Sequence, residues 1–204
     1  LLSRGGSDWI AGSGKAEKVE GGYRINARKV FTSGAPTGDI LMTGAMLDTD
    51  DGPMVLHFGV PMTSPHVKIL DTWRTMGMRG TGSHDILIEG HVVPEAAVAV
   101  KRKAGEWHPV FQTIATIAFP LVYAVYLGVA ESARDIAINL AKRKAQNRHA
   151  ITLAGQMETE LTAARLAHES MLAAVRLNAP SAATVNQVMI GRQLVARHAI
   201  AAVE

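Results

Sequence analysis

Short β-rich segments separated by turn residues fill the first half of the chain. Turn clusters such as Gly34-Ala35-Pro36 and Asp50-Asp51-Gly52-Pro53 punctuate it, and Gly80-Thr81-Gly82 follows further on. The predicted strands are residues 23–26, 40–47, 54–60, 67–70 and 86–92. Several short strands at this spacing predict an antiparallel β-barrel or sandwich.

Apolar residues recur at helical spacing in the second half. One face is formed by Val122, Val125, Val129, Ala133, Ile136 and Leu140, and a second by Leu153, Met157, Leu161, Ala164, His168, Met171 and Val175. Residues 178–181, with Pro180 and Ser181, are expected to end that second helix and cap a third, which runs from about residue 182 to the end. Three such helices make most of a bundle, and a fourth is expected to be missing. The change of pattern predicts two domains, residues 1–105 and 106–204.

Composition narrows the classes of function. The chain has 204 residues, of which 48% are hydrophobic, and no cysteine, which excludes disulfides, thiolate catalysis and cysteine metal sites. A net charge of +3 without a basic and aromatic patch argues against nucleic acid, and the run 101–103 is interpreted as a solvated linker. The apolar stretch 114–129 is interrupted by Pro120, so no membrane span is expected. Histidines and carboxylates lack metal-ligand spacing, and we predict no metal site.

Two segments carry candidate chemistry. In residues 29–36, a strand ending in Phe31, Thr32 and Ser33 could present an aromatic ring and hydroxyls at a rim, where a flat ligand would stack; the alternative is that Phe31 packs into the core. In residues 79–85, Thr81, Ser83 and His84 could line a ligand site, and the alternative is an ordinary hairpin loop. His168, on an apolar helix face, is expected to be a satisfied core histidine.

A third segment opens the chain. Gly6 and Ser7 lie in a Gly-Gly-Ser-Asp sequence, where glycine permits a close backbone approach and serine supplies a donor. The alternative is a simple turn in which Asp8 caps the residues after it. Because the chain begins at Leu1 inside this segment, we interpret the sequence as a fragment.

The order of residues 5–8, 22–26, 29–34 and 77–81, followed by a strand ending in Val-Val-Pro, resembles the middle domain of the acyl-CoA dehydrogenase superfamily. The resemblance implies an α+β fold, with an antiparallel β-barrel middle domain followed by an incomplete α-helical bundle. It implies FAD, or alternatively FMN, as cofactor. It further implies that the flavin contacts Gly6, Ser7, Phe31, Thr32 and Ser33, that Arg143 reaches the flavin pyrophosphate of a neighbouring subunit, and that Thr81, Ser83 and His84 face the substrate.

Several positions depart from the family's dehydrogenase pattern. Phe31 replaces the usual tryptophan, Phe119 stands where an arginine contacts the CoA arm, and Ala118 stands where some branches keep the catalytic glutamate; other branches place that base beyond Glu204. The Thr81-Gly82-Ser83 sequence is closer to the flavin-dependent monooxygenase branch.

The resemblance leaves three functions open. The first is oxidation of the CH–CH bond of an acyl-CoA or similar thioester. The alternatives are a two-component monooxygenase using reduced flavin, and a catalytically silent binding module. We expect a cytoplasmic homo-oligomer, dimer or tetramer, with a small-molecule substrate and an electron-transfer or flavin-reductase partner.

Overall fold

The computed structural model describes residues 10–143 and 146–204. The chain forms two compact units, Leu1–Trp107 and His108–Glu204. The first unit contains the strands and the second contains the long helices. An α+β fold is thereby confirmed.

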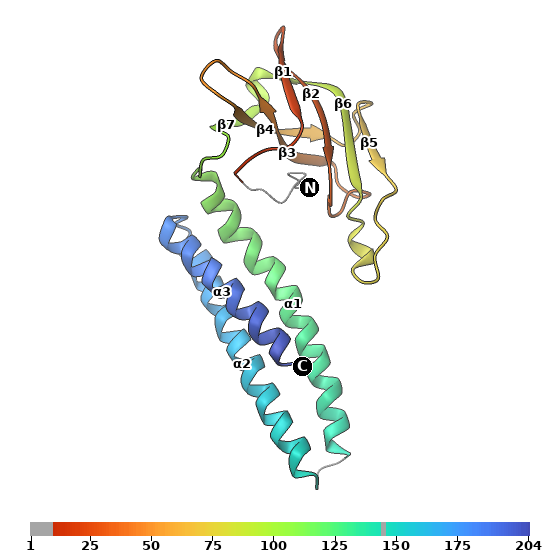
Figure 1. The fold of residues 1–204 in the computed structure, drawn as a ribbon, viewed down its shortest axis with the longest axis vertical. Coiled ribbons are helices and arrows are strands. Elements are labelled where there is room, and N and C mark those ends of the chain that lie inside the picture. Colours follow the sequence, from red (N-terminus) through yellow and green to blue (C-terminus); the bar gives the residue numbers. More distant parts are fainter. Residues whose placement is uncertain (1–9, 144–145) are drawn as a thin grey trace. The chain divides into compact units, whose positions relative to one another are not determined.

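The first unit is a seven-stranded sheet (Figure 1). Its strands are β1 (Lys15–Val19), β2 (Gly22–Lys29), β3 (Ile40–Leu47), β4 (Met54–Pro61), β5 (Val67–Leu70), β6 (Asp85–Pro94) and β7 (Val98–Lys103), with the short 3-10 helices η1 (Arg79–Thr81) and η2 (Glu95–Ala97) on either side of β6. Along the sheet the order is β5-β6-β2-β1-β3-β4-β7.

The sheet differs from the predicted antiparallel barrel in two ways. β1 and β3 pair in parallel, because the chain leaves β2 through the turn at residues 30–39 and returns on the other side of β1. Within the described residues, β5 pairs only with β6 and β7 only with β4, so the sheet stays open. The five predicted strands are present, whereas β1 and β7 were not predicted from the sequence.

The prediction for the charged residues 101–103 is wrong. We expected a solvated linker, yet these residues form the end of β7 and pair with Met54, Val55 and Leu56 of β4. Arg102 is buried, and its guanidinium donates to the carbonyl oxygen of Ile10 and to Nε2 of His57. A buried guanidinium needs such acceptors, and strand pairing delivers it to them.

Alternate residues of the strands form the core of this unit. In β2, every second residue is buried, namely Tyr23, Ile25, Ala27 and Lys29, and the residues between them are exposed. This period of two is expected of a sheet with one packed face. The apolar core consists of Ala16, Tyr23, Ile25, Ala27, Ala35, Leu41, Ala45, Leu47, Leu56, Phe58, Val60, Ile86, Ile88 and Val93.

The second unit packs three helices together (Figure 1). They are α1 (Val110–Lys142), α2 (Arg148–Arg176) and α3 (Ala182–Ala201). Asn147 caps α2 by accepting from the backbone N–H groups of His149 and Ala150, and Ser181 forms a capping box with Thr184 at the start of α3. The predicted stop and restart at residues 178–181 is confirmed.

The interruption that we expected at Pro120 is wrong, because α1 continues through it for 33 residues. The carbonyl oxygen of Pro120 accepts a hydrogen bond of 2.9 Å from Nε2 of buried His168, which confirms His168 as a satisfied core histidine. By length and composition α1 is also the one helix in the described residues that could cross a membrane. Core helices of bundles pass the same test, so this is weak evidence, and the absence of a membrane span stays a prediction.

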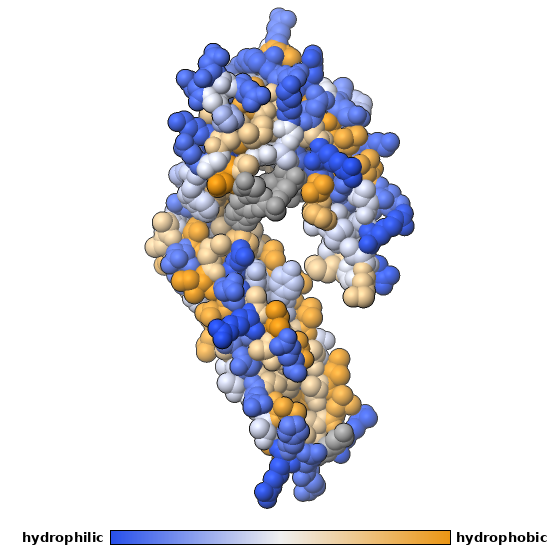
Figure 2. Space-filling model, in the orientation of Figure 1, coloured by the Kyte–Doolittle hydropathy of each residue, from blue (hydrophilic) through white to orange (hydrophobic). Residues whose placement is uncertain are grey.

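The predicted apolar face of α2 is buried between the helices from Leu161 to Met171, whereas Leu153 near its start is 50% exposed, and most of the predicted face of α1 is exposed. Leu161, Ala164 and Met171 pack in the bundle. In contrast, Val122, Val125, Val129, Ile136 and Leu140 are exposed, and α1 uses Phe119, Tyr123, Leu127 and Ala130 against its neighbours. Apolar surface along this unit is visible in Figure 2.

Candidate functional site

Two segments that are far apart in sequence meet at one end of β2 and β6. The turn after β2 donates from Gly34 N to the carbonyl oxygen of Thr81 at 2.7 Å, and from Thr32 N to the carbonyl oxygen of His84 at 3.1 Å. Pro36 packs on Gly82 so closely that a Cβ there would lie 2.9 Å from its ring. Gly82 also has a φ of +50°, so both space and backbone conformation favour glycine.

Three hydroxyl groups form a chain across this junction. Ser33 Oγ lies 2.9 Å from Ser83 Oγ, which lies 2.7 Å from Thr81 Oγ1. Thr81 Oγ1 in turn donates to the carbonyl oxygen of Met78 at 2.9 Å. Ser83 is buried and Ser33 is exposed, so the chain runs from the interior to the rim.

Phe31 stands at the same rim with its ring in solvent. The side chain is 71% exposed, which removes the alternative of core packing. Its backbone has a φ of +53°, a conformation that non-glycine residues rarely adopt and that often marks a functional site. The ring lies edge-on to Trp73, with 6.3 Å between ring centroids.

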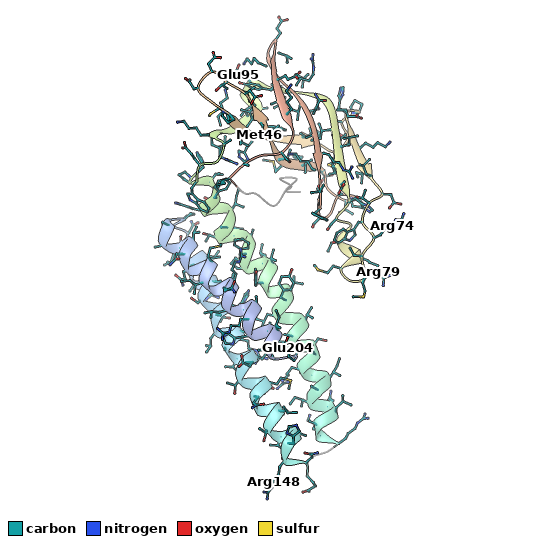
Figure 3. The ribbon with its side chains drawn as sticks, viewed as in Figure 1. Met46, Arg74, Arg79, Glu95, Arg148 and Glu204 are labelled. Atoms are coloured by element: carbon teal, nitrogen blue, oxygen red, sulfur yellow. The ribbon has the colours of Figure 1, made fainter. Side chains whose placement is uncertain are left out.

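The loop between β5 and β6 supplies the residues that sequence reasoning missed. Trp73 donates from its indole nitrogen to the carbonyl oxygen of Met78, which has a left-handed backbone. Met76 is 98% exposed, and Arg74 and Arg79 project from the same loop (Figure 3). A tryptophan and methionines in a glycine-containing loop were the available signal, but such residues are equally common in cores.

Two predicted site residues, Thr32 and His84, already form hydrogen bonds within the protein. Thr32 is fully buried, and its hydroxyl donates to the carbonyl oxygen of Lys29, so it is not available to a ligand. His84 uses Nδ1 to accept from the backbone N–H groups of Thr72 and Trp73, both at 3.1 Å. The proton of a neutral His84 is therefore on Nε2, and the ring holds the loop in place. Its predicted contact with substrate is not supported by this arrangement.

The acids near the rim are paired with arginines. Arg28 donates through Nε and Nη2 to Oδ2 of Asp85, which is buried, and Arg74 pairs with Asp71. Thr72 Oγ1 accepts from the backbone N–H of Asp85 at 2.8 Å, which ties the loop to β6. The rim therefore offers aromatic surface and hydroxyls for binding, while its carboxylates are held as ion pairs.

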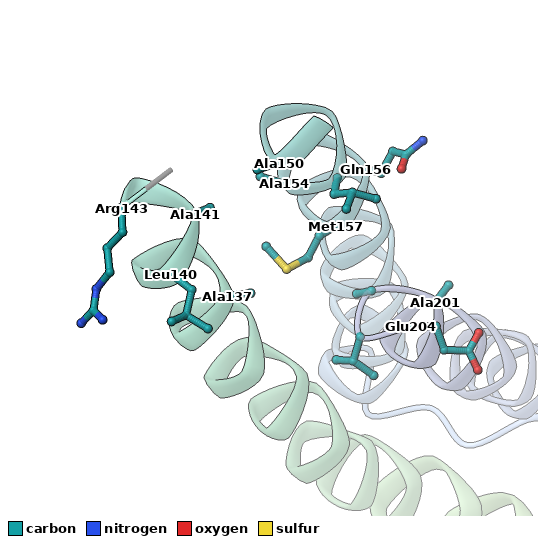
Figure 4. Close-up of a pocket in the computed structure, with 13 residues that line it drawn as sticks. Ala137, Leu140, Ala141, Arg143, Ala150, Ala154, Gln156, Met157, Ala201 and Glu204 are labelled. Carbon is teal, nitrogen blue, oxygen red and sulfur yellow. The ribbon is translucent and has the colours of Figure 1, made fainter. Parts of the chain in front are cut away.

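The remaining predicted residues lie elsewhere. Gly6 and Ser7 fall outside the described residues. Arg143 follows the end of α1, beside an open groove of about 640 Å³ between the ends of α1 and α2 and the end of α3. Arg143 is one of the residues that line the groove, and its guanidinium points away from Met157, which points into the space between the helices (Figure 4). The groove is lined largely by alanine, leucine and methionine without convergent polar groups, so we interpret it as uncovered helix surface.

No group of three or more metal-binding side chains occurs in the described residues, in which cysteine is absent. Within those residues the structure therefore gathers no set of side chains that could hold a metal ion. That the protein needs no metal stays a prediction.

Comparison with known proteins assigns the first unit. Residues 3–90 match the family profile described as acyl-CoA dehydrogenase, middle domain. Over these residues the chain is similar to the acyl-CoA dehydrogenase superfamily. The chain is 31% identical over 127 residues to the amino sugar nitrososynthase DnmZ of Streptomyces peucetius, covering 62% of this chain and 31% of that protein. It is 32% identical over 122 residues to indole-3-acetate monooxygenase of Pseudomonas putida, covering 59% and 31%.

Solved structures extend the likeness to the helices of the second unit. A structure of KijD3 in complex with FMN and dTDP-3-amino-2,3,6-trideoxy-4-keto-3-methyl-D-glucose matches with a TM-score of 0.82 at 25% identity, over 97% of this chain and 51% of that one. The HsaA monooxygenase from M. tuberculosis matches with a TM-score of 0.76 at 18% identity, over 98% and 57%, which shows the shared fold alone. The chain thus spans about a third of these curated relatives and about half of the solved chains.

Proposed function

We propose that the protein is a flavin-dependent oxidoreductase whose isoalloxazine ring lies against the rim formed by Phe31 and Ser33. The observation that carries this proposal is the solvent-exposed Phe31 beside the hydroxyl chain of Ser33, Ser83 and Thr81. An exposed ring offers a stacking surface, and a hydroxyl at its side offers a hydrogen bond to a polar ring edge. FMN and FAD are equal candidates, since solved relatives are described as complexes with each.

Within that class we favour a monooxygenase that uses reduced flavin from a partner reductase. Matching relatives are described as an indole-3-acetate monooxygenase and as nitrososynthases. When bound, the flavin would supply the electron pair for oxygen activation, and the residues of this chain would bind and orient it. A small organic molecule is the substrate class that these relatives support.

Acyl-CoA oxidation is the second candidate, and one observation favours it. The guanidinium of Arg192 on α3 lies 4.8 Å from the ring centroid of Phe119. A cation is therefore present near the position where the dehydrogenase pattern has an arginine. Against it, Ala118 cannot remove a proton from an α-carbon, and proton abstraction by a positioned base contributes on the order of 10² to 10⁴ in rate. The thioester reaction therefore lacks its base among the residues of this chain that the resemblance singles out.

Two measurements test the proposal. FMN and FAD are titrated into the protein and into Phe31→Ala and Ser33→Ala; losing one hydrogen bond from Ser33 costs about two- to tenfold in affinity, and removing the stacking surface of Phe31 should also weaken binding. Equal affinity in all three proteins would remove this site. Flavin-loaded protein is then mixed anaerobically with a panel of acyl-CoA thioesters. We expect no bleaching of the oxidised flavin band, and rapid stoichiometric bleaching would favour the second candidate.

A further inference from the structure

The hydroxyl chain has a defined direction. The carbonyl oxygen of Met78 can only accept, so the single hydroxyl proton of Thr81 is directed to it over 2.9 Å. Thr81 Oγ1 must then accept from Ser83 over 2.7 Å. Since the proton of Ser83 is used there, Ser83 Oγ accepts from Ser33 over 2.9 Å.

The reverse direction is disfavoured. It would leave the oxygens of Thr81 and Met78 2.9 Å apart with no proton between them, so that two lone pairs would face each other. The Met78 carbonyl is itself held in place, because it also accepts from the indole nitrogen of Trp73. Ser83 is 4% exposed, so water has little access to the middle of the chain and cannot readily replace either bond.

As a consequence, the exposed Ser33 hydroxyl donates its proton to Ser83 Oγ and presents only lone pairs to a ligand. The oxidised isoalloxazine has a bare lone pair at N5, whereas the reduced ring carries a hydrogen there. We propose that the ring edge facing Ser33 is the one that carries N5, and that Thr81 and Ser83 are positioning residues that set Ser33 as an acceptor, so that the site prefers reduced over oxidised flavin. This inference rests on the proposed flavin function, and extends it to the redox state that the site selects.

Three variants of the chain separate this role from simple folding. Thr81→Val keeps the shape but removes the acceptor of Ser83, which then donates to Ser33 and turns the Ser33 proton toward the ligand. Ser83→Ala cuts the chain, so Ser33 can donate or accept. Thr81→Ser retains every hydrogen bond. Ser64→Ala serves as the control, because Ser64 also bonds through its hydroxyl, to Nδ1 of His91, in the same unit.

The experiment measures the dissociation constants of oxidised and reduced FMN and FAD under anaerobic conditions, together with the midpoint potential of the bound flavin. We expect Thr81→Val to lower the ratio of oxidised to reduced dissociation constants about two- to tenfold. A tenfold change lowers the midpoint potential by about 30 mV for a two-electron couple. Ser83→Ala should give a smaller change in the same direction, while Thr81→Ser and Ser64→Ala keep the wild-type ratio.

The outcomes distinguish the two levels of the argument. If the wild type binds neither redox form, the proposed function fails and this inference fails with it. If flavin binds but Thr81→Val and Ser83→Ala keep the wild-type ratio, or weaken both forms equally, only the inference is overturned. A structural role alone would lower both affinities without moving the potential.

Discussion

The two units differ in how completely they bury their large apolar side chains. In the sheet unit, the large core side chains Tyr23, Ile25, Leu41, Leu56, Phe58, Ile86 and Ile88 are all nearly inaccessible. In the helical unit, α1 leaves Leu121, Val122, Val125, Val129, Ile136 and Leu140 at least 46% exposed. The core of the sheet unit is therefore well covered, whereas the helical unit leaves a large apolar surface of α1 exposed.

The reason lies in geometry. A strand alternates its side chains between two faces, so one packed face uses half of its residues. α1 carries apolar residues around more of its circumference than the two neighbouring helices cover in the described part of the chain. The expected homo-oligomer would use this surface, and it stays a prediction.

The largest expected effect is on the sheet core. Phe58→Ala removes a fully buried ring from β4, and such truncations cost about 3–5 kcal/mol of unfolding free energy. Tryptophan fluorescence follows this unit, because all three tryptophans lie in residues 1–107. The loss should be the same at low and high protein concentration. Phe31→Ala is the control and should stay within about 0.5 kcal/mol; a comparable loss there would contradict the exposed position of Phe31.

The next effect concerns the exposed face of α1. Val129→Lys places a charge where the side chain is 65% exposed in this chain but would be buried in an oligomer. We expect association to weaken by about 1.5–3 kcal/mol, or roughly ten- to hundredfold in dissociation constant. Sedimentation over a concentration series measures it. Thr162→Lys adds the same charge on an exposed position of α2 and is the control. A wild type that stays monomeric at micromolar concentration would contradict the prediction.

A smaller effect is expected where α2 and α3 pack together. A Cβ added at Gly191 would lie 2.3 Å from Cγ of buried Met171 and 3.1 Å from the carbonyl oxygen of Ala167. Gly191→Ala should cost about 1–3 kcal/mol through overpacking, which exceeds the roughly 1 kcal/mol that alanine gains over glycine in a helix. Far-UV circular dichroism during unfolding measures it. Gly155→Ala in α2 meets nothing within 4 Å and should stabilise instead; the same sign for both variants would refute the packing argument.

Much of the fold was predictable because periodicity reports local geometry. The residues of β3 were predicted to the residue, and Ser181 marked the start of α3 by its capping chemistry. β7 was missed because its residues 101–103 are charged, and their hydrogen bonds come from β4 and from residues distant in sequence. Periodicity also could not show which face of α1 packs, since both of its faces are apolar.

For the site, sequence order identified the segments but not the partners of their atoms. Phe31 and Ser33 were expected at a rim, and the structure places both there. That Thr32 is buried between them follows from the backbone twist at Phe31, with its positive φ, which no periodicity reveals. The hydroxyl chain depends on bonds between residues 33 and 83, fifty positions apart, and needed the fold.

The smallest effect concerns the acid sensitivity of the sheet unit. Partial burial, and to a lesser degree the neighbouring His66, lower the pKa of His91 from its ordinary value of 6.5. The folded state therefore binds fewer protons than the unfolded state in the interval below that value, so stability is fully present above about pH 6.5 and falls as the pH drops through the lowered pKa. His91 also contacts Ser64 Oγ through Nδ1 at 3.1 Å. His91→Gln should flatten the fall of the urea midpoint, followed by tryptophan fluorescence, between about pH 7 and pH 5. His149→Gln changes an exposed residue of the helical unit and should leave that slope unchanged, whereas an unaltered slope in His91→Gln would exclude His91 as its source.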